Sequence, residues 1–423
     1  MKLIDRPQRS FLFLQGPPGP FFAMLGAELR ARGCAVHRIN LNGGDKRDWS
    51  EGGVDYRGPV SRWPIFVDRY MRENGITDLM LYGDCRPMHI AAHGMAKLRG
   101  IAIHVLEEGY IRPDWMTLEP DGVNGRSTLS RDPQWFLDQA RNLPPVPVLP
   151  PITASFGRRA HDSYWHYHRI VTGRLHFPYY RPHRPGSIIM DGFGWLNRFR
   201  LAKRRAREAE AVLRAIKGSD YFLFPLQLTA DYQIRAHSPF GDMKTAAEYV
   251  IESFGRHAPS SARLVVKEHP LDSTFFDWCS FVRKTARRFG CEDRIFHIDG
   301  GDLEALSSAS RGMICVNSTS GTLALACGTP VMVLGDAIYD IPGMTHQGRL
   351  DEFWTAPKQP DVRLFDAFHR VLLARCLIRG GLASQSATRI LVQSTIERLM
   401  MPTELRVAST VIEVEARWAR RGT

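Results

Sequence analysis

The stretch Gly312–Gly335, GMICVNSTSGTLALACGTPVMVLG, decides the fold expected for this chain. Its first apolar run, Met313–Val316, predicts a buried strand, and Pro330–Leu334 predicts a second one. Between them, Asn317–Thr319 reads as a polar turn that leads into a helix of small residues, Ser320–Cys327. A strand, a helix and a second strand in this order are the repeating unit of parallel sheets.

The turn in this stretch is crowded with hydrogen-bonding groups. A helix N-terminus carries a partial positive charge and free backbone N–H groups, so it accepts anions readily. Two interpretations stay open: capping of an ordinary core helix, and a cradle for a phosphate. The residues concerned are Asn317, Ser318, Thr319, Ser320, Gly321 and Thr322.

The same alternation of strands and helices occurs twice along the chain, which predicts two α/β halves. From Ile111 to about Pro185 the regular pattern fades, and the last ~60 residues are expected to be largely helical. The fold class predicted is therefore α/β and GT-B-like, with two Rossmann-type parallel-sheet domains facing a cleft and C-terminal helices. Further strands are expected at Ser10–Gln15, Cys34–Asn40, Asp78–Gly83, Ile101–Leu106, Tyr221–Leu228, Arg263–Lys267 and Arg294–Ile298.

Composition narrows the class of protein. The 423 residues exceed one ordinary core, and no run approaches the ~18 apolar residues of a membrane span. The apolar run Phe11–Leu14 is too short for a signal-peptide core, so a cytoplasmic location is expected, free or on the membrane's cytosolic face. Seven scattered cysteines without a C-x-x-C pair indicate neither disulfides nor a zinc site.

The net charge of +12 calls for an anionic partner: nucleic acid, anionic lipid or an anionic small substrate. No nucleic-acid-reading motif is present, so nucleic acid is not expected. Basic residues gather in the predicted helix Leu196–Lys217, either as a solvated face or as a contact for anionic lipid headgroups, worth ~1 kcal/mol each. They are Arg198, Arg200, Lys203, Arg204, Arg205 and Arg207.

A histidine-rich segment invites a metal-site interpretation, but its spacing fits no standard ligand pattern, so no metal is expected. An aromatic, basic segment between domains or facing a membrane is the preferred interpretation. Its histidines are His161, His166, His168, His176 and His183.

Carboxylates follow two predicted strands. Asp84 comes directly after one strand, and Glu107 and Glu108 end the next. Acid–base or nucleophilic chemistry on a sugar needs carboxylates of this kind near the anomeric carbon. Because adjacent strand residues point to opposite faces, only one of the two glutamates is expected to face a ligand. A solvated acidic loop is the alternative for the pair.

A second group of polar residues follows the strand that ends in VVKEHP. Lys267 and His269 lie two residues apart and so share a face, and Pro270 fixes the turn. Together they could bind a phosphate and stabilise its charge as it leaves. No D-x-D sequence for a metal–diphosphate clamp is present, which favours a donor with a monophosphate leaving group, a CMP-sugar.

The order of the E-E-G turn, the His-Pro dipeptide and the Ser/Thr pair resembles the motif set of bacterial GT-B sialyltransferases that use CMP-activated sugars. More specifically, four blocks resemble the capsule polysaccharide synthesis family of KpsS/LipB type. They lie within roughly Phe11–Asn124 and Tyr221–Phe353, most of the chain. The blocks are YGDCRPMH, EEGYIRPDW with GVNG after it, KEHPLD, and VNSTSGTLALACGTPV.

This resemblance implies a retaining transferase for 3-deoxy-D-manno-oct-2-ulosonic acid (Kdo), moving it from CMP-Kdo to a (lyso)phosphatidylglycerol-type lipid. Family members are also named capsule export proteins, which implies a role in polysaccharide transport. By motif, Asp84 with Glu107 or Glu108 would supply the acid/base or nucleophile. His269 and Pro270 would hold the CMP phosphate and ribose, and Ser318–Ser320 the phosphate.

The resemblance also implies the domain roles and partners. An acceptor or catalytic domain is expected at 1–185, a basic linker helix at 186–217, a nucleotide-sugar domain at 218–360, and helices packing across both at 361–423. The expected partners are the CMP-sugar, an anionic glycolipid or phospholipid, the cytoplasmic face of the inner membrane, and other capsule assembly proteins, with no cofactor or metal. Two rival functions remain: transfer of another CMP-ulosonic acid, and a non-catalytic assembly or export factor.

Overall fold

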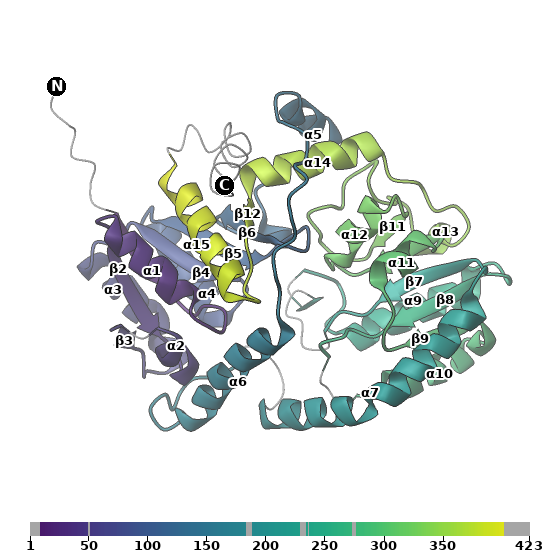
Figure 1. The fold of residues 1–423 in the computed structure, drawn as a ribbon, viewed down its shortest axis with the longest axis horizontal. Coiled ribbons are helices and arrows are strands. Elements are labelled where there is room, and N and C mark those ends of the chain that lie inside the picture. The colour runs from purple at the N-terminus through teal and green to yellow at the C-terminus, as the bar shows by residue number, and fades with distance from the viewer. Residues whose placement is uncertain are drawn as a thin grey trace. The chain divides into compact units, whose positions relative to one another are not determined.

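The chain divides into two units, and each is built around a β-sheet of its own (Figure 1). The computed structural model describes residues 9–49, 51–182, 188–228, 234–235, 237–272 and 276–401. Unit 1 comprises Met1–Thr128, Asn142–His183 and Arg370–Thr423, and unit 2 comprises Leu129–Arg141 and Arg184–His369. The chain therefore returns to unit 1 after it has completed unit 2.

The sheet of unit 1 has seven strands in the order β12-β6-β5-β4-β1-β2-β3. Strands β1 to β5 run parallel to one another, whereas β6 is antiparallel to both β5 and β12. Apolar runs such as SFLF in β1 are buried on both faces, as is typical of parallel strands. The strands are β1 (Ser10–Phe13), β2 (Ala35–Asn40), β3 (Val54–Asp55), β4 (Asp78–Tyr82), β5 (Ala102–Glu108), β6 (Trp115–Pro120) and β12 (Leu377–Arg379).

Helices pack on this sheet in pairs. The helices of the first pair contact each other through a core that includes Phe11, Phe13, Leu25 and Leu391. The helices of the second pair lie more than a hundred positions apart in the sequence. The first pair is α1 (Phe21–Ala31) with α15 (Gln385–Met400), and the second is α2 (Gly43–Asp48) with α6 (Phe156–Thr172). A third pair is α3 (Trp63–Glu73) with α4 (Pro87–Leu98), and short turns are η1 (Val60–Arg62) and η2 (Asn124–Arg126).

The sheet of unit 2 has five parallel strands in the order β11-β10-β7-β8-β9. Its core includes Phe222, Val266, Phe254 and Trp354, all fully or almost fully buried. The strands are β7 (Tyr221–Pro225), β8 (Arg263–Lys267), β9 (Ile295–Ile298), β10 (Gly312–Cys315) and β11 (Val331–Val333). The helices are α5 (Pro133–Ala140), α7 (Ile188–Ile216), α9 (Met243–His257), α10 (Trp278–Arg288), α11 (Leu303–Ser308), α12 (Ser320–Ala326) and α13 (Leu350–Phe353), with η3 (Glu292–Arg294); α14 (Val362–Arg375) runs from unit 2 into unit 1.

Each sheet reverses its strand order once. In unit 1, β2 and β3 lie on one side of β1 while β4 and β5 lie on the other. In unit 2, β8 and β9 lie on one side of β7 while β10 and β11 lie on the other. Ligands of open α/β sheets bind outside the carboxyl ends of strands at such a reversal. The topology thus marks one candidate ligand edge in each unit, beside β1 and β4 and beside β7 and β10.

The predicted fold class is confirmed: two parallel-sheet α/β halves with helices toward the C-terminus. The opening stretch forms β10, α12 and β11 in the expected order. The expected cleft between the halves stays a prediction. The helix expected at Val411–Arg421 and the residue His183 lie outside the described residues.

Two local expectations were wrong. The segment from Ile111 to Pro185 contains β6, α5 and α6 rather than irregular structure, and α7 begins at Ile188 rather than Leu196. The C-terminal part is largely helical as expected, and its short strand β12 joins the sheet of unit 1. Helix α6 was not predicted although its apolar residues recur with a helical period, and it packs on α2 through buried Asp162, His166 and Ile170. Tertiary packing, rather than helix propensity, therefore stabilises it.

Candidate functional site

At the carboxyl edge of unit 1, Gly83 forms the turn that follows β4. Its φ of +70° is a left-handed conformation that glycine adopts without strain, and its N–H donates to the Leu106 carbonyl at 2.8 Å. A Cβ placed on Gly83 would lie 3.8 Å from Oε2 of Glu107 and 4.0 Å from Nε of Arg86. The Glu107 carboxylate therefore lies beside this turn, at the end of the neighbouring strand.

Glu108, the next residue, is held by an ion pair. Its Oε1 lies 2.5 Å from Nη2 of Arg159 on α6 and accepts a hydrogen bond from the Tyr82 hydroxyl at 3.4 Å. Burial opposes ionisation of Glu108, but the charges of Arg159 and Arg112 outweigh it, so its pKa lies below the ordinary value. Glu108 is thus a fixed carboxylate at neutral pH. Sequence analysis did not identify Arg159, because α6 was not predicted.

Asp84 is buried, and its carboxylate contacts the loop that follows β6. Its Oδ2 accepts a hydrogen bond from the Val123 N–H at 3.4 Å and lies 4.0 Å from Nη1 of Arg126. The thiol of Cys85 donates to its Oδ1 at 3.2 Å. These contacts tie the β4 turn to the GVNG segment that the sequence analysis singled out.

The reversal point of the unit 1 sheet carries two further polar residues. Arg86 donates from Nη1 to the Gln15 carbonyl at 3.4 Å, which links the turns after β4 and β1. His89 is fully buried, and its Nδ1 lies 2.6 Å from the Gly83 carbonyl oxygen. Burial, with the charge of Arg86, lowers the pKa of His89 to about 3, so it is neutral at physiological pH. It can hold the Gly83 turn but cannot bind an anion by charge.

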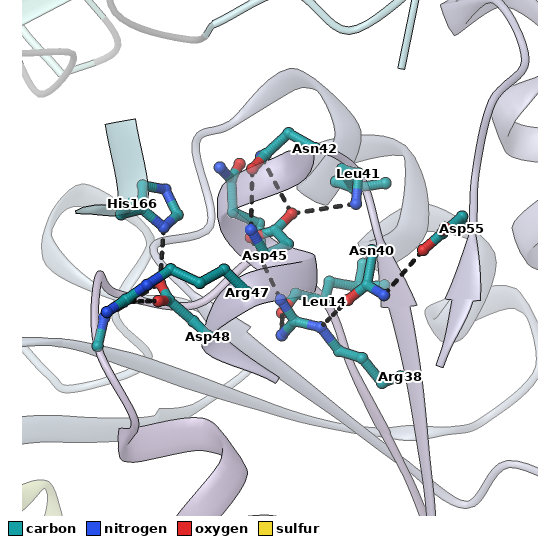
Figure 2. A network of polar contacts seen from close by, with 12 residues as sticks. Leu14, Arg38, Asn40, Leu41, Asn42, Asp45, Arg47, Asp48, Asp55 and His166 are labelled. Atoms are coloured by element: carbon teal, nitrogen blue, oxygen red, sulfur yellow. Dashed lines mark hydrogen bonds and ion pairs between the residues drawn. The ribbon is translucent and has the colours of Figure 1, made fainter. Parts of the chain in front are cut away.

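A buried polar network supports this edge from β2 and α2 (Figure 2). Arg38 and Asp45 are almost fully buried and form an ion pair at 3.2 Å. Asp48 accepts from the Gly19 N–H at 3.1 Å and pairs with Nδ1 of His166 at 2.7 Å. The contact between Asp48 and His166 ties α6 to α2, and it thereby positions the arginine that holds Glu108.

At the carboxyl edge of unit 2, Lys267 ends β8 and is 7% exposed. Burial and the charge of Arg198 lower its pKa, although acidic side chains nearby act in the opposite direction. The structure gives its ammonium group no hydrogen bond and no ion pair with the described residues. A cation in a largely buried residue that forms no ion pair is costly, which makes this position a candidate for binding an anion.

The next residue, Glu268, is fully engaged. Its Oε1 lies 3.0 Å from Nη1 of Arg198, and its Oε2 lies 3.4 Å from Nε2 of His297. Arg198 also pairs with Asp299, which in turn lies 2.7 Å from Nη1 of Arg205. Two of the six basic residues predicted on the helix 196–217 therefore form partly buried ion pairs inside unit 2 instead of a solvated face.

His269 and Pro270 form the turn after β8. Nδ1 of His269 accepts the Leu271 N–H at 3.0 Å, and its carbonyl accepts the Asp272 N–H at 3.0 Å. The acceptor role of Nδ1 places a ring proton on Nε2. His269 is half-buried and Pro270 is exposed.

Side chains from outside the turn after β10 hold that turn in place. Gln227 exchanges two hydrogen bonds with Asn317, at 3.1 Å and 2.8 Å, and so bridges the carboxyl ends of β7 and β10 at the reversal point. The Tyr339 hydroxyl donates to the Ser318 carbonyl. A Cβ on Gly321 would lie 2.4 Å from that hydroxyl, so only glycine fits there. Gln227 and Tyr339 were not identified from the sequence.

Within the turn, hydroxyl groups form some of the hydrogen bonds that the first residues of α12 require. The Ser318 hydroxyl accepts from the Ser320 N–H at 3.2 Å and from the Ser320 hydroxyl at 2.7 Å. Thr322 is buried and donates to the carbonyl of Thr319 at 2.7 Å, so it supports the helix rather than presenting a donor. The half-buried Ser318, Thr319 and Ser320 are left as the candidate ligand contacts.

The predicted residues thus fall into two groups. Lys267, His269 and the turn Asn317–Thr322 follow β8 and β10, which flank β7 at one edge of the unit 2 sheet. Asp84 and the two glutamates lie at the corresponding edge of unit 1. Among the described residues, no cluster of His, Cys, Asp or Glu could hold a metal ion. None of the helices in the described ranges is long and apolar enough to cross a membrane.

Comparisons with known proteins match most of the chain. The capsule polysaccharide export protein KpsS of Escherichia coli is 32% identical over 382 residues, covering 88% of this chain and 96% of that protein. The capsule polysaccharide modification protein LipB of Neisseria meningitidis serogroup B is 32% identical over 393 residues, covering 89% and 92%. Among solved structures, the β-Kdo 2,7 transferase KpsC of Thermosulfurimonas dismutans matches with 14% identity and a TM-score of 0.44, covering 92% of this chain and 99% of that one.

The family description "Capsule polysaccharide biosynthesis protein" matches residues 77–382, which include the acids after β4 and β5 and the whole candidate edge of unit 2. This range and the two relatives at 32% identity agree with the resemblance of the sequence motifs. The chain therefore belongs to the capsule polysaccharide biosynthesis family.

Proposed function

We propose that this protein is a glycosyltransferase that moves Kdo from CMP-Kdo to a (lyso)phosphatidylglycerol-type lipid, with retention of anomeric configuration. Membership of the capsule polysaccharide biosynthesis family supports the biological context. The choice of Kdo and of the lipid acceptor rests on the motif resemblance described above.

The observation that carries the proposal is Lys267, a residue only 7% exposed whose ammonium group has no ion pair or hydrogen bond to the described residues. It lies at the carboxyl end of β8, one strand from the reversal point where Gln227 and Asn317 meet. A phosphate monoester there would supply the missing negative charge. His269 and the Ser318 hydroxyl would add donors without a metal ion.

In this proposal the edge of unit 2 stabilises the leaving group. When the bond from the sugar to CMP breaks, negative charge grows on the phosphate, and a preorganised ammonium and imidazole N–H stabilise that charge. Asn317 positions the turn through Gln227 and does not itself contact the phosphate. Pro270 fixes the conformation of the chain beside the nucleotide.

The edge of unit 1 supplies the carboxylate. We assign the chemistry to Glu107, because its carboxylate lies beside the Gly83 turn at the carboxyl edge of the sheet. Arg159 fixes Glu108, and Asp84 holds the GVNG segment. Retention requires a carboxylate nucleophile or an equivalent, because two inversions at the anomeric carbon are needed. Arg86 lies beside the same Gly83 turn and would hold the charge of the acceptor or of the sugar carboxylate.

The test uses the full chain with CMP-Kdo and a short-chain lysophosphatidylglycerol. We expect release of CMP together with a lipid product heavier by one Kdo or more, and proton–carbon couplings that report the retained configuration. Absence of CMP release under all conditions would leave a non-catalytic capsule assembly or export factor. Turnover with CMP-sialic acid in preference to CMP-Kdo would assign another ulosonic acid.

The proposal places the protein peripherally on the cytoplasmic face of the inner membrane, where the lipid acceptor and other capsule assembly proteins would be reached. The net charge of +12 suits the anionic donor, the anionic acceptor and the membrane surface. Fractionation of cells by flotation, with and without high salt, tests this location directly.

A further inference from the structure

The first half of α7 has an inner side fixed to unit 2. Arg198 pairs with Glu268 at 3.0 Å and Arg205 pairs with Asp299 at 2.7 Å. Farther along, Ala209 is buried on the same side. Because one turn of an α-helix takes 3.6 residues, positions 198, 205 and 209 lie within one narrow stripe along the helix. That stripe defines which face of the helix is directed away from unit 2.

The outward face begins with large apolar side chains. Phe193 is 55% exposed, Leu196 is 65% exposed and Phe199 is 60% exposed. Met190, one turn earlier, is also more than half exposed. At about 100° per residue, Phe193 and Leu196 lie opposite the buried stripe, and Met190 and Phe199 lie on its two flanks. Exposed apolar residues usually occur singly, and a row of this kind on one helix marks a surface that is covered in use. We call Met190, Phe193, Leu196 and Phe199 the apolar row.

Basic residues continue the same outward face over the next two turns. Arg200, Lys203 and Arg207 have no ion pair or hydrogen bond to the described part of the chain, unlike Arg204, which pairs with Glu208 at 2.8 Å. The sequence from 192 to 207 contains no aspartate or glutamate. The free cations Arg200, Lys203 and Arg207, here called the basic row, therefore directly follow the apolar row.

We infer that this face of α7 docks on an anionic phospholipid bilayer. Apolar side chains of an interfacial helix enter the boundary between headgroups and acyl chains, and neighbouring basic side chains contact lipid phosphates. The apolar row and the basic row supply both parts in adjacent turns. The inference is separate from the proposed transfer reaction, since it concerns adsorption to a bilayer without donor or acceptor.

Two other occupants fit less well. A nucleic acid would neutralise the basic row but would leave Phe193, Leu196 and Phe199 exposed to water. A second copy of this chain, docked symmetrically through the same face, would place two basic rows against each other, and like charges across an interface oppose association. An anionic bilayer satisfies both rows at once.

The experiment is sedimentation of the full chain with sucrose-loaded vesicles, without CMP-Kdo. One set contains phosphatidylcholine alone, and the other contains phosphatidylcholine and phosphatidylglycerol at about 7:3. We expect binding to the anionic set that weakens with salt. The variants Phe193→Ser/Leu196→Ser/Phe199→Ser and Arg200→Gln/Lys203→Gln/Arg207→Gln should each lower the partition coefficient at least about tenfold.

Matched controls distinguish binding through this face from nonspecific adsorption of the protein to vesicles. Ile65→Ser/Leu98→Ser removes equally exposed apolar residues from unit 1, which are 75% and 80% exposed, and should leave binding unchanged. Arg214→Gln removes a cation that is paired with Glu210 on the same helix and should have little effect. Circular dichroism melting checks folding, and Arg200→Lys/Lys203→Arg/Arg207→Lys, which keeps all three charges, should bind like the natural protein.

Several results would overturn the inference. Equal binding to neutral and anionic vesicles, or wild-type partition of both triple variants, would remove the role of this face. Loss of a dimer in the apolar-row variant with unchanged vesicle binding would assign the face to a second copy. Competition by RNA that depends on the basic row alone, without any vesicle binding, would assign it to nucleic acid.

Discussion

The two sheets of this protein reverse their strand order in the same way, yet the charged residues at their carboxyl edges differ in whether they have ion-pair partners. In unit 1, Glu108 is paired with Arg159, and Asp84 is surrounded by donors. In unit 2, Glu268 is paired with Arg198, but the neighbouring Lys267 is buried without an ion pair to any described residue. The edge of unit 1 therefore holds Glu108 and Asp84 through fixed partners, whereas at the edge of unit 2 Lys267 forms no ion pair with a described acid.

The difference indicates what each edge can bind. A carboxylate that is fixed by a guanidinium group stays ionised and does not rearrange during a reaction, which suits a site where charge must be positioned. An unpaired buried ammonium destabilises the fold until an anion arrives. Stability given up at a binding site is a common feature of functional proteins. This difference supports our proposal that unit 1 supplies the reacting carboxylate and unit 2 binds the anion.

The largest effect is expected at the carboxylate that unit 1 does not pair with Arg159. Glu107→Gln should lower turnover by about 10³-fold, because general acid–base and nucleophilic groups contribute on this scale, while the melting temperature stays close to the natural value. CMP release over time measures it. Glu108→Gln is the matched control, with an expected loss of tenfold or less. A larger loss in Glu108→Gln than in Glu107→Gln would exchange the two roles.

The second effect tests the unpaired cation of unit 2. Lys267→Met should weaken CMP binding by about 30-fold, the size of a lost charge-assisted hydrogen bond. Because burial lowers the pKa of Lys267, the folded state carries a cost at neutral pH that methionine removes, so the melting temperature should stay level or rise. Calorimetry and thermal unfolding measure the two quantities.

The exposed Lys97 of unit 1 supplies a control for Lys267. Lys97→Met should leave both CMP affinity and melting temperature unchanged, since its closest acid, Asp121, lies 4.0 Å away at the surface. Natural CMP affinity in Lys267→Met would end the assignment of anion binding to this edge.

The third effect is a pH dependence that belongs to unit 2. Burial alone would lower the pKa of His297, but Cys279 and the carboxylate of Glu268, whose Oε2 lies 3.4 Å from Nε2, outweigh it and raise the pKa to about 9. A raised histidine pKa contributes stability that is complete below the unfolded value near 6.5 and is lost as the pH rises through about 9. The contribution should be about 2–3 kcal/mol, measured by urea unfolding at pH 6 and 9.5.

His297→Gln should flatten this pH dependence, because glutamine cannot take up the proton. His257, a half-exposed histidine that lies 3.7 Å from Asp351 in the same unit, provides the comparison, and His257→Gln should keep the slope. An unchanged slope in His297→Gln would show that the ion network around Glu268 does not depend on an imidazolium.

The smallest effect concerns the pair that holds Glu108. Arg159→Met should lower the free energy of unfolding by about 1 kcal/mol at pH 7, a modest value because both side chains are about one-third exposed and solvent screens the pair. Since the pKa of Glu108 is lowered, this difference should shrink as the pH falls and the carboxylate takes up a proton. Arg141→Met, which breaks an exposed pair with Asp138, should be close to neutral.

Much of the fold could be predicted from local pattern. The apolar runs of β1, β4, β8 and β10 and the turn chemistry around Asn317 placed the strands and their carboxyl ends correctly, because periodicity and turn residues act within a few positions. Gly321 belongs to the turn expected from the sequence, but the Tyr339 hydroxyl that it makes room for was not predicted.

The partners of the site residues could not be predicted. Arg159 reaches Glu108 across 51 positions, and Arg198 reaches Glu268 across 70. No local rule pairs residues so far apart, and the basic run at Arg198–Arg207 gave no sign of which cations would turn inward. Helix α6 was missed for the same reason, since its contacts with α2 stabilise it more than its own composition does.

The sequence by itself determined the alternation of strands and helices, the two sheets and the residues at their carboxyl ends, because hydrophobic period and turn preference are properties of neighbouring residues. Only the tertiary structure decided which charges are paired and which stay unpaired. It also brought β12 from near the C-terminus into the first sheet and turned the apolar row of α7 outward. Ion pairing and burial depend on distances in space, and these follow from the packing of the whole chain.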